Sequence, residues 1–96
     1  MKTKTKAKKA VEITEGLGEF ATAHKGQMRF FKMSPPLDGN KYVCVSAVSG
    51  PFATETYIFP ADKTGEVTGW GELEGSMKGV VDHAAALSNA GYTIHA

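Results

Sequence analysis

The sequence predicts an α+β fold, a small antiparallel β-sheet of about four to five strands with one main C-terminal α-helix packed on one face. Segments rich in valine, threonine and aromatic residues, such as residues 41–49 and 54–60, indicate strands. Proline, glycine and aspartate cluster between these segments and indicate turns. Residues 76–91 are rich in alanine and have capping residues at both ends, which indicates the helix.

The distribution of charge divides the chain into a basic tail and one domain. The 96 residues, 42% hydrophobic and 22% charged, are typical of a single globular domain. Residues 10–96 carry six basic and ten acidic side chains, a net charge of −4. We therefore expect residues 1–9 to form a basic disordered tail and residues 10–96 a single α+β domain. The basic residues of the tail are Lys2, Lys4, Lys6, Lys8 and Lys9.

The same composition predicts a cytoplasmic protein. No apolar run is long enough to span a membrane, and none follows the basic N-terminus as in a secretory signal. The one cysteine, Cys44, excludes an internal disulfide framework and fits a reducing compartment. We therefore expect no membrane partner.

The segment at residues 10–26 allows two interpretations. Its apolar residues fall on one helical face, but Gly16 and Gly18 would each cost about 1 kcal/mol inside a helix. The alternative is a strand at residues 11–13, a turn at residues 15–18 and a second strand at residues 19–23. The glycines favour the strands.

The middle of the chain predicts three strands. Residues 27–33 form the first, the two prolines that follow hold the chain extended, and Asp38-Gly39-Asn40 supplies a turn. Residues 41–49 form the clearest strand, and both of its faces are apolar, which indicates a central strand covered on both sides. Residues 54–60 form the third, and we expect Pro60 to end it.

The segment DKTGEVT at residues 62–68 resembles the phosphorylated-aspartate motif of the ion-pumping ATPases, in which the aspartate is a nucleophile. Glu66 replaces the threonine of that family, and the chain has no room for the doubly wound domain that the chemistry needs. Asp62 to Gly65 also suit a type I turn that ends in a left-handed glycine. We therefore predict a hairpin turn here, with a return strand at residues 66–70.

The closing helix is expected to begin at either Ser76 or Asp82 as its N-cap. Gly91 suits the left-handed position after the helix, and Tyr92 should pack back on Leu87. Residues 92–96 could add a short edge strand. The predicted apolar stripe comprises Met77, Val80, Val81, Ala84 and Leu87.

No catalytic, cofactor or metal site is predicted. Cys44 lies among valines, where a cysteine is typically a core residue, although His24, His83 or His95 could serve as its base. Asp82 and His83 are adjacent, so on a helix they point about 100° apart. No pair of histidine or cysteine residues has the spacing of a structural zinc site.

A further pattern within residues 54–92 comprises residues 55–61, 65–67, Trp70, Asp82-His83 and 90–92. It resembles a pattern in short uncharacterised proteins encoded by bacteriophages and prophages. The resemblance implies a phage accessory protein that lies in the host cytoplasm and binds a host component, such as a defence or transcription factor, and it brings no catalytic residue.

We therefore expect a small non-enzymatic binding protein that modulates or inhibits a host protein. A homodimer is a further expectation, because one helix cannot cover both faces of the sheet. The first alternative is a nucleic-acid-associated protein that uses the lysine tail, and the second is a small enzyme that uses Asp82, His83 or Cys44. The candidate partner-binding residues are Phe52, Trp70, His83 and Tyr92.

Overall fold

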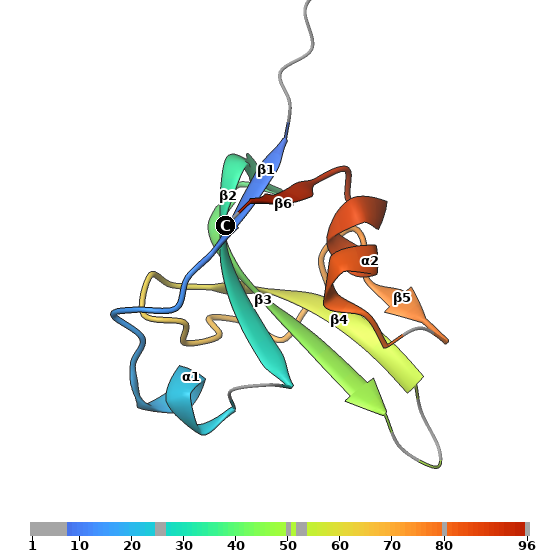
Figure 1. Ribbon diagram of the computed structural model, residues 1–96, viewed down its shortest axis with the longest axis horizontal. Helices are drawn as coiled ribbons and strands as arrows, with labels where there is room; N and C mark the ends of the chain where they lie inside the picture. The colour runs from blue at the N-terminus through green and yellow to red at the C-terminus, as the bar shows by residue number, and fades with distance from the viewer. Residues whose placement is uncertain (1–7, 25–26, 50, 52–53, 80, 96) are drawn as a thin grey trace, which may run out of the picture.

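The computed structural model describes residues 8–24, 27–49, 51, 54–79 and 81–95 (Figure 1). Its six strands form one sheet in the order β5-β4-β3-β2-β1-β6, with β6 parallel to β1 and the other neighbouring pairs antiparallel. The predicted α+β class is confirmed, but the sheet is mixed, has six strands and is accompanied by two helices. The elements are β1 (Lys9–Glu12), α1 (Glu19–Ala23), β2 (Met28–Leu37), β3 (Asn40–Ser49), β4 (Thr54–Ala61), β5 (Met77–Lys78), α2 (His83–Asn89) and β6 (Thr93–His95).

The start of the sheet lies slightly earlier than predicted. Lys9 was expected to end the basic tail, but it opens β1 and pairs with Ser34 of β2 and Thr93 of β6. The other lysines of the predicted tail, apart from Lys8, lie outside the described residues.

The three central strands form where the sequence predicts them, although β2 continues beyond its predicted end at residue 33, through Pro35 and Pro36 to Leu37. Asp38 and Gly39 have φ values of 50° and 80°, and their tight turn joins β2 to β3, as predicted. Pro60 was expected to end β4, but the strand continues to Ala61. The carbonyl of Pro60 accepts from the backbone N–H of Thr68, on the side away from β3. The nitrogen of a strand residue faces the same side as its carbonyl, so the missing N–H removes no bond to β3.

Both faces of the central strand β3 are covered, as predicted. Helix α2 lies on one face, and its Leu87 packs with Val43 and Val45 in the larger core cluster. The opposite face carries Cys44, which packs with Phe30 and with Ala21 of α1. The sequence did not predict that α1 covers this face. A homodimer was expected because one helix cannot cover both faces of the sheet, and the presence of α1 removes that reason.

The N-terminal segment contains both a strand and a helix. The strand predicted at residues 11–13 is confirmed in part, since β1 ends at Glu12, but the strand predicted at residues 19–23 is wrong, because these residues form α1. The helix begins after Gly16 and Gly18, so neither glycine destabilises it. Thr22 Oγ1 donates a hydrogen bond to the Gly18 carbonyl, 2.9 Å away, and Ala21 is buried against the sheet.

The C-terminal helix begins at the second of its two candidate caps. Asp82 is the N-cap, whereas Ser76 lies at the sheet edge, where its hydroxyl accepts from the Ile58 N–H and donates to the Leu73 carbonyl. Gly75 and Gly79 have φ values of 105° and 81°, which are incompatible with one continuous helix.

The predicted apolar stripe of this helix is therefore largely wrong. Met77 lies in β5, Val81 is 43% exposed and Ala84 is exposed, while Val80 lies outside the described residues. Leu87 alone of the predicted stripe is buried in α2, together with Ala86, and Ala90 is buried at the C-cap.

The end of the helix is as predicted. Gly91 has a φ of 95°, and its N–H donates to the Ser88 carbonyl, while the Tyr92 N–H donates to the Leu87 carbonyl, 2.8 Å away. This is the Schellman pattern, and Tyr92 packs with Leu87 in the core. The predicted short edge strand is β6. Among the described residues, no helix is long and apolar enough to cross a membrane.

Candidate partner-binding site

Three of the four residues predicted to bind a partner can be placed. Trp70 is 61% exposed, His83 is half-buried and Tyr92 is only 4% exposed. Phe52 lies outside the described residues. The expectation of an exposed aromatic is therefore confirmed for Trp70 and wrong for Tyr92.

Tyr92 is buried because the chain turns inward after Gly91. Its hydroxyl donates to the Pro35 carbonyl, 2.5 Å away, and its ring packs in the larger core. Lys8 Nζ lies 5.6 Å from the centre of the ring. Burial raises the pKa of the Tyr92 hydroxyl, and the charges of Asp38 and Glu74 act in the same direction. The hydroxyl therefore stays protonated and continues to hold the backbone of β2.

Trp70 is the exposed member of a group of ring-bearing side chains, which we call the aromatic patch. The Trp70 ring meets the Phe59 ring edge-on at a centroid distance of 5.1 Å and an angle of 69°, and the Phe20 ring at 6.3 Å and 65°. His24 lies against Phe20 at 4.4 Å, and Tyr57 against Phe59 at 5.7 Å. The patch thus consists of Phe20, His24, Tyr57, Phe59 and Trp70.

Three parts of the chain build this patch, namely α1, β4 and the loop that follows β4. The N–H of Gly18 donates to the Thr64 carbonyl, 2.9 Å away, which joins the start of α1 to the loop. Gly65 is buried between them, and a larger residue would not fit, because a Cβ atom there would lie 2.7 Å from the Cβ of Ala21. Sequence reasoning missed the contributions of α1 and β4, although the alternation of Tyr57 and Phe59 could have indicated a shared face.

Exposed carboxylates flank the aromatic patch along the chain. Glu19 precedes Phe20 on α1, and Glu66 and Glu72 stand in the loop on either side of Trp70. Lys63 is the exposed basic residue of the same loop. Among the described residues, the exposed sequence neighbours of the patch are therefore more often acidic than basic.

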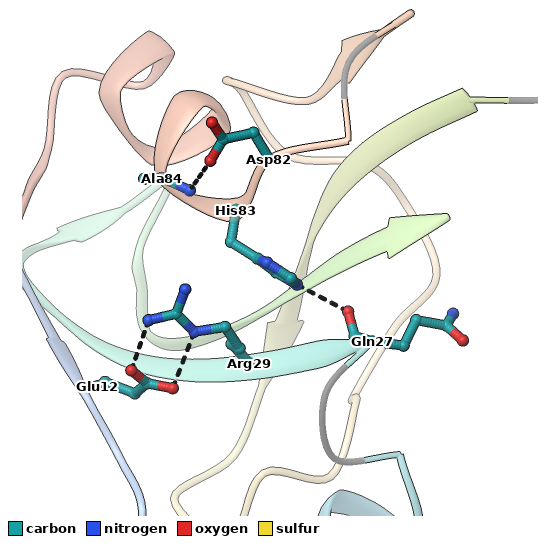
Figure 2. A network of polar contacts seen from close by, with 6 residues as sticks. All are labelled: Glu12, Gln27, Arg29, Asp82, His83 and Ala84. Carbon is teal, nitrogen blue, oxygen red and sulfur yellow. Dashed lines mark hydrogen bonds and ion pairs between the residues drawn. The ribbon is translucent and has the colours of Figure 1, made fainter. Parts of the chain in front are cut away.

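Asp82 and His83 act on different partners, as predicted (Figure 2). The Asp82 carboxylate accepts from the backbone N–H groups of Ala84 and Ala85, at 3.0 and 3.2 Å, which is the role of an N-cap. The His83 ring points the other way, and its Nε2 lies 2.8 Å from the Gln27 carbonyl. A carbonyl can only accept, so Nε2 carries a proton and donates it. His83 therefore ties α2 to the start of β2.

An ion pair that the sequence did not indicate lies beside this histidine. Arg29 Nε and Nη2 donate to the two carboxylate oxygens of Glu12, at 2.9 and 2.6 Å (Figure 2). The hydrogen bond from Arg29 lowers the pKa of Glu12 against the opposing effect of desolvation. The pair joins β1 to β2 across 17 positions of the sequence, so only the strand pairing brings it together.

The Glu12–Arg29 pair should make stability fall in acid. The pKa of Glu12 is lower in the folded state than in the unfolded state. The stability that Glu12 contributes is therefore fully present above the unfolded-state pKa, and it is lost as the pH falls through the folded-state pKa. Glu12→Gln should lower the free energy of unfolding by about 1 kcal/mol at neutral pH, and it should reduce the loss of stability below about pH 5. Urea unfolding followed by circular dichroism at several pH values measures both. Arg29→Gln should flatten the profile equally, and a Glu12→Gln profile parallel to that of the wild type would contradict the assignment.

A pocket of about 310 Å³ opens where β1 ends beside β2. Its walls are mainly apolar, and the Glu12–Arg29 pair lies among its lining residues. The two charged groups already bind each other, so the pocket offers mainly apolar surface. The lining residues are Glu12, Ile13, Thr14, Leu17, Met28, Arg29 and Phe30.

The remaining residues with catalytic potential serve the fold. Cys44 is fully buried, and burial raises the pKa of its thiol to about 12, which opposes formation of the nucleophilic thiolate. Asp62 Oδ1 accepts from the Thr64 hydroxyl at 2.6 Å and from the N–H groups of Thr64 and Glu66. These bonds lower the pKa of Asp62, with that from the Thr64 hydroxyl having the largest effect.

The segment at residues 62–68 is thus a turn, as predicted. The Gly65 N–H donates to the Asp62 carbonyl, and Gly65 has a φ of 87°. The return strand predicted at residues 66–70 is wrong, because only Val67 forms a bridge, to Ala61. Within the described part of the chain, no three histidine, cysteine, aspartate or glutamate side chains group as metal ligands would.

Comparison of the chain with protein-family models, curated proteins and solved structures finds no match. The function is therefore argued from the residues of the aromatic patch and from the charges around them.

Proposed function

We propose that this protein is a small binding protein that modulates or inhibits a host protein through the aromatic patch. The exposure of Trp70 is the observation that carries the proposal. An indole that is 61% exposed, yet held edge-on by Phe20 and Phe59, presents a large and preorganised contact surface. Tryptophan is among the residues that most often dominate the energy of an interface.

The charges around the patch favour a partner of a particular kind. Glu19, which precedes Phe20 in the sequence, is exposed, as are Glu66 and Glu72 of the loop that carries Trp70. They complement arginine and lysine side chains, and an arginine can also stack on the indole face. We therefore propose that the partner is a protein whose contact surface is apolar at its centre and basic at its rim.

The resemblance of residues 54–92 to short phage and prophage proteins supports a phage accessory protein in a bacterial host. The segment contains three of the contributors to the patch, namely Tyr57, Phe59 and Trp70. Residues 55–61 and Trp70, which both carry the resemblance, thus meet at the aromatic patch. A host defence or transcription component is the class of partner that we propose.

The proposal is tested by affinity capture from a bacterial lysate, followed by measurement of the binding constant for the captured protein. Trp70→Ala should weaken binding at least about 30-fold, the effect of removing a dominant aromatic contact. Glu72→Lys should weaken binding further and reduce its dependence on salt. Circular dichroism of each variant verifies that the fold is retained.

Val81→Ala provides the matched control. Val81 is also an exposed apolar residue, at 43%, but it precedes α2 on the other side of the sheet. This variant should bind the captured protein as the wild type does. A partner that binds Trp70→Ala and the wild type equally would contradict the proposal.

A further inference from the structure

A second surface lies on the face of the sheet opposite α2, toward β1 and β6. Strand register places Val11 beside Lys32 of β2 and beside His95 of β6, and Lys32 beside Tyr42 of β3. On the same face, Lys9 lies beside Ser34 and Thr93. We call this group the basic sheet surface, which comprises Lys9, Val11, Lys32, Ser34, Tyr42, Thr93 and His95.

These side chains point to solvent because their neighbours along each strand point to the core. Ala10, Met33 and Val43 alternate with them and pack in the cluster under α2. Lys9, Lys32, Ser34, Thr93 and His95 are exposed, Val11 is 39% exposed and Tyr42 is half-buried. Helix α1 covers the same face over Phe30 and Cys44, away from β1 and β6 (Figure 1).

The charge of the basic sheet surface opposes that of the rest of the domain. None of its seven positions is acidic, and two of them are lysine. The sequence before β1 also contains Lys2, Lys4 and Lys6, whereas residues 10–96 carry a net charge of −4. Lys8 is not counted here because its Nζ lies over the Tyr92 ring. Positive charge is thus concentrated at β1, at the neighbouring position of β2 and in the residues that precede them, which is the charge complement of a polyanion.

We propose that the basic sheet surface binds single-stranded nucleic acid. Lys9 and Lys32 contact phosphates, and the Tyr42 ring stacks on a base. The three residues lie on three neighbouring strands, so their backbone positions are separated by about 5–12 Å, a spacing that a short stretch of nucleic acid can bridge. An exposed sheet with an aromatic side chain accepts unpaired bases, whereas it offers no helix to enter the major groove of a duplex.

This inference does not depend on the proposed partner protein. The aromatic patch is built by α1, β4 and the loop after β4, whereas β1, β2, β3 and β6 supply the basic sheet surface. A variant of either surface leaves the residues of the other unchanged, so failure of one proposal can be distinguished from failure of the other.

The test uses fluorescence anisotropy of a labelled single-stranded DNA of about 12 nucleotides with the full chain at several salt concentrations. Replacing both Lys9 and Lys32 with alanine should weaken binding at least about fivefold and lower the salt slope by about 0.7 for each lost phosphate contact. Tyr42→Leu, which retains an apolar side chain for packing, should also weaken binding. A duplex of the same length should bind more weakly than the single strand.

The matched control replaces Lys63 and Lys78 with alanine. Both are exposed and lie outside the basic sheet surface, so this pair changes the net charge equally and should leave binding within about twofold of the wild type. Equal weakening by the two pairs would overturn the inference, because only net charge would then matter. If Tyr42→Leu binds the single strand as tightly as the wild type does, the Tyr42 ring does not stack on a base and the inference is overturned.

Deletion of residues 1–7 separates the sheet from the lysines that precede it. The shortened chain should bind more weakly but remain sensitive to Lys32→Ala. If the deletion abolishes binding, and Lys32→Ala in the full chain has no effect, the N-terminal lysines alone are responsible and the sheet surface is not a site.

Discussion

Gly75→Ala is expected to lower the free energy of unfolding by about 3 kcal/mol or more, because Gly75 combines a left-handed backbone with very close neighbours. Its φ is 105°, which a side chain disfavours. A Cβ atom there would lie 2.7 Å from the Cβ of Ala90, 2.9 Å from the Ala86 carbonyl oxygen and 3.0 Å from Cδ1 of Ile58. Two of these three atoms are backbone or the first atom of a side chain, so they cannot move without moving α2 or its C-cap.

Gly79→Ala is the control that measures only the cost of placing a side chain at a positive φ, without a clash. Gly79 has a comparable positive φ of 81°, but nothing lies within 4 Å of the position of its Cβ. This variant should cost about 1 kcal/mol. Urea unfolding followed by circular dichroism compares the two. If the two variants lose equal free energy of unfolding, Ala86, Ala90 and Ile58 do not lie as close to Gly75 as the structure indicates.

The same glycines explain why the beginning of the closing helix could not be predicted. Ser76 and Asp82 are both good N-caps, and the residues between them include the apolar Met77, Val80 and Val81. What decides between the caps is tertiary. The Ser76 hydroxyl is held by Ile58 and Leu73 at the edge of β4, and Gly75 must pass close to α2. A sequence shows that a glycine is present but not which neighbour requires it.

The central sheet was predictable because its signals are local. Valine and aromatic residues mark β3 and β4, and the Asp38-Gly39 turn marks the junction of β2 and β3, although the register of these strands shifts between Leu37 and Lys32. The parallel pairing of β1 with β6 is not local, since Val11 and His95 are neighbours in the sheet and distant in the sequence. The part of the basic sheet surface formed by Thr93 and His95 depends on this pairing, so no sequence pattern indicated it.

The candidate site shows a similar division. Trp70 was predicted as an exposed aromatic residue at the end of a return strand, and the structure leaves it exposed but in a loop. Tyr92 had been expected both to pack on Leu87 and to meet a partner, and only the first expectation agrees with its burial. The two expectations competed for one side chain. The Schellman ending, which requires residue C″ to pack inward, decided between them.

Leu87→Ala is expected to lower the free energy of unfolding by about 3 kcal/mol, within the usual range for a buried leucine. Leu87 is fully buried and is the large apolar side chain by which α2 contacts the cluster around Val43, Val45 and Ile58. Val81→Ala should cost less than about 0.5 kcal/mol, because Val81 is 43% exposed. The sequence placed both residues on one apolar stripe, whereas a helix that begins at Asp82 excludes Val81 from it. Chemical unfolding of the two variants therefore measures where the helix begins, and comparable losses would restore the longer helix that starts at Ser76.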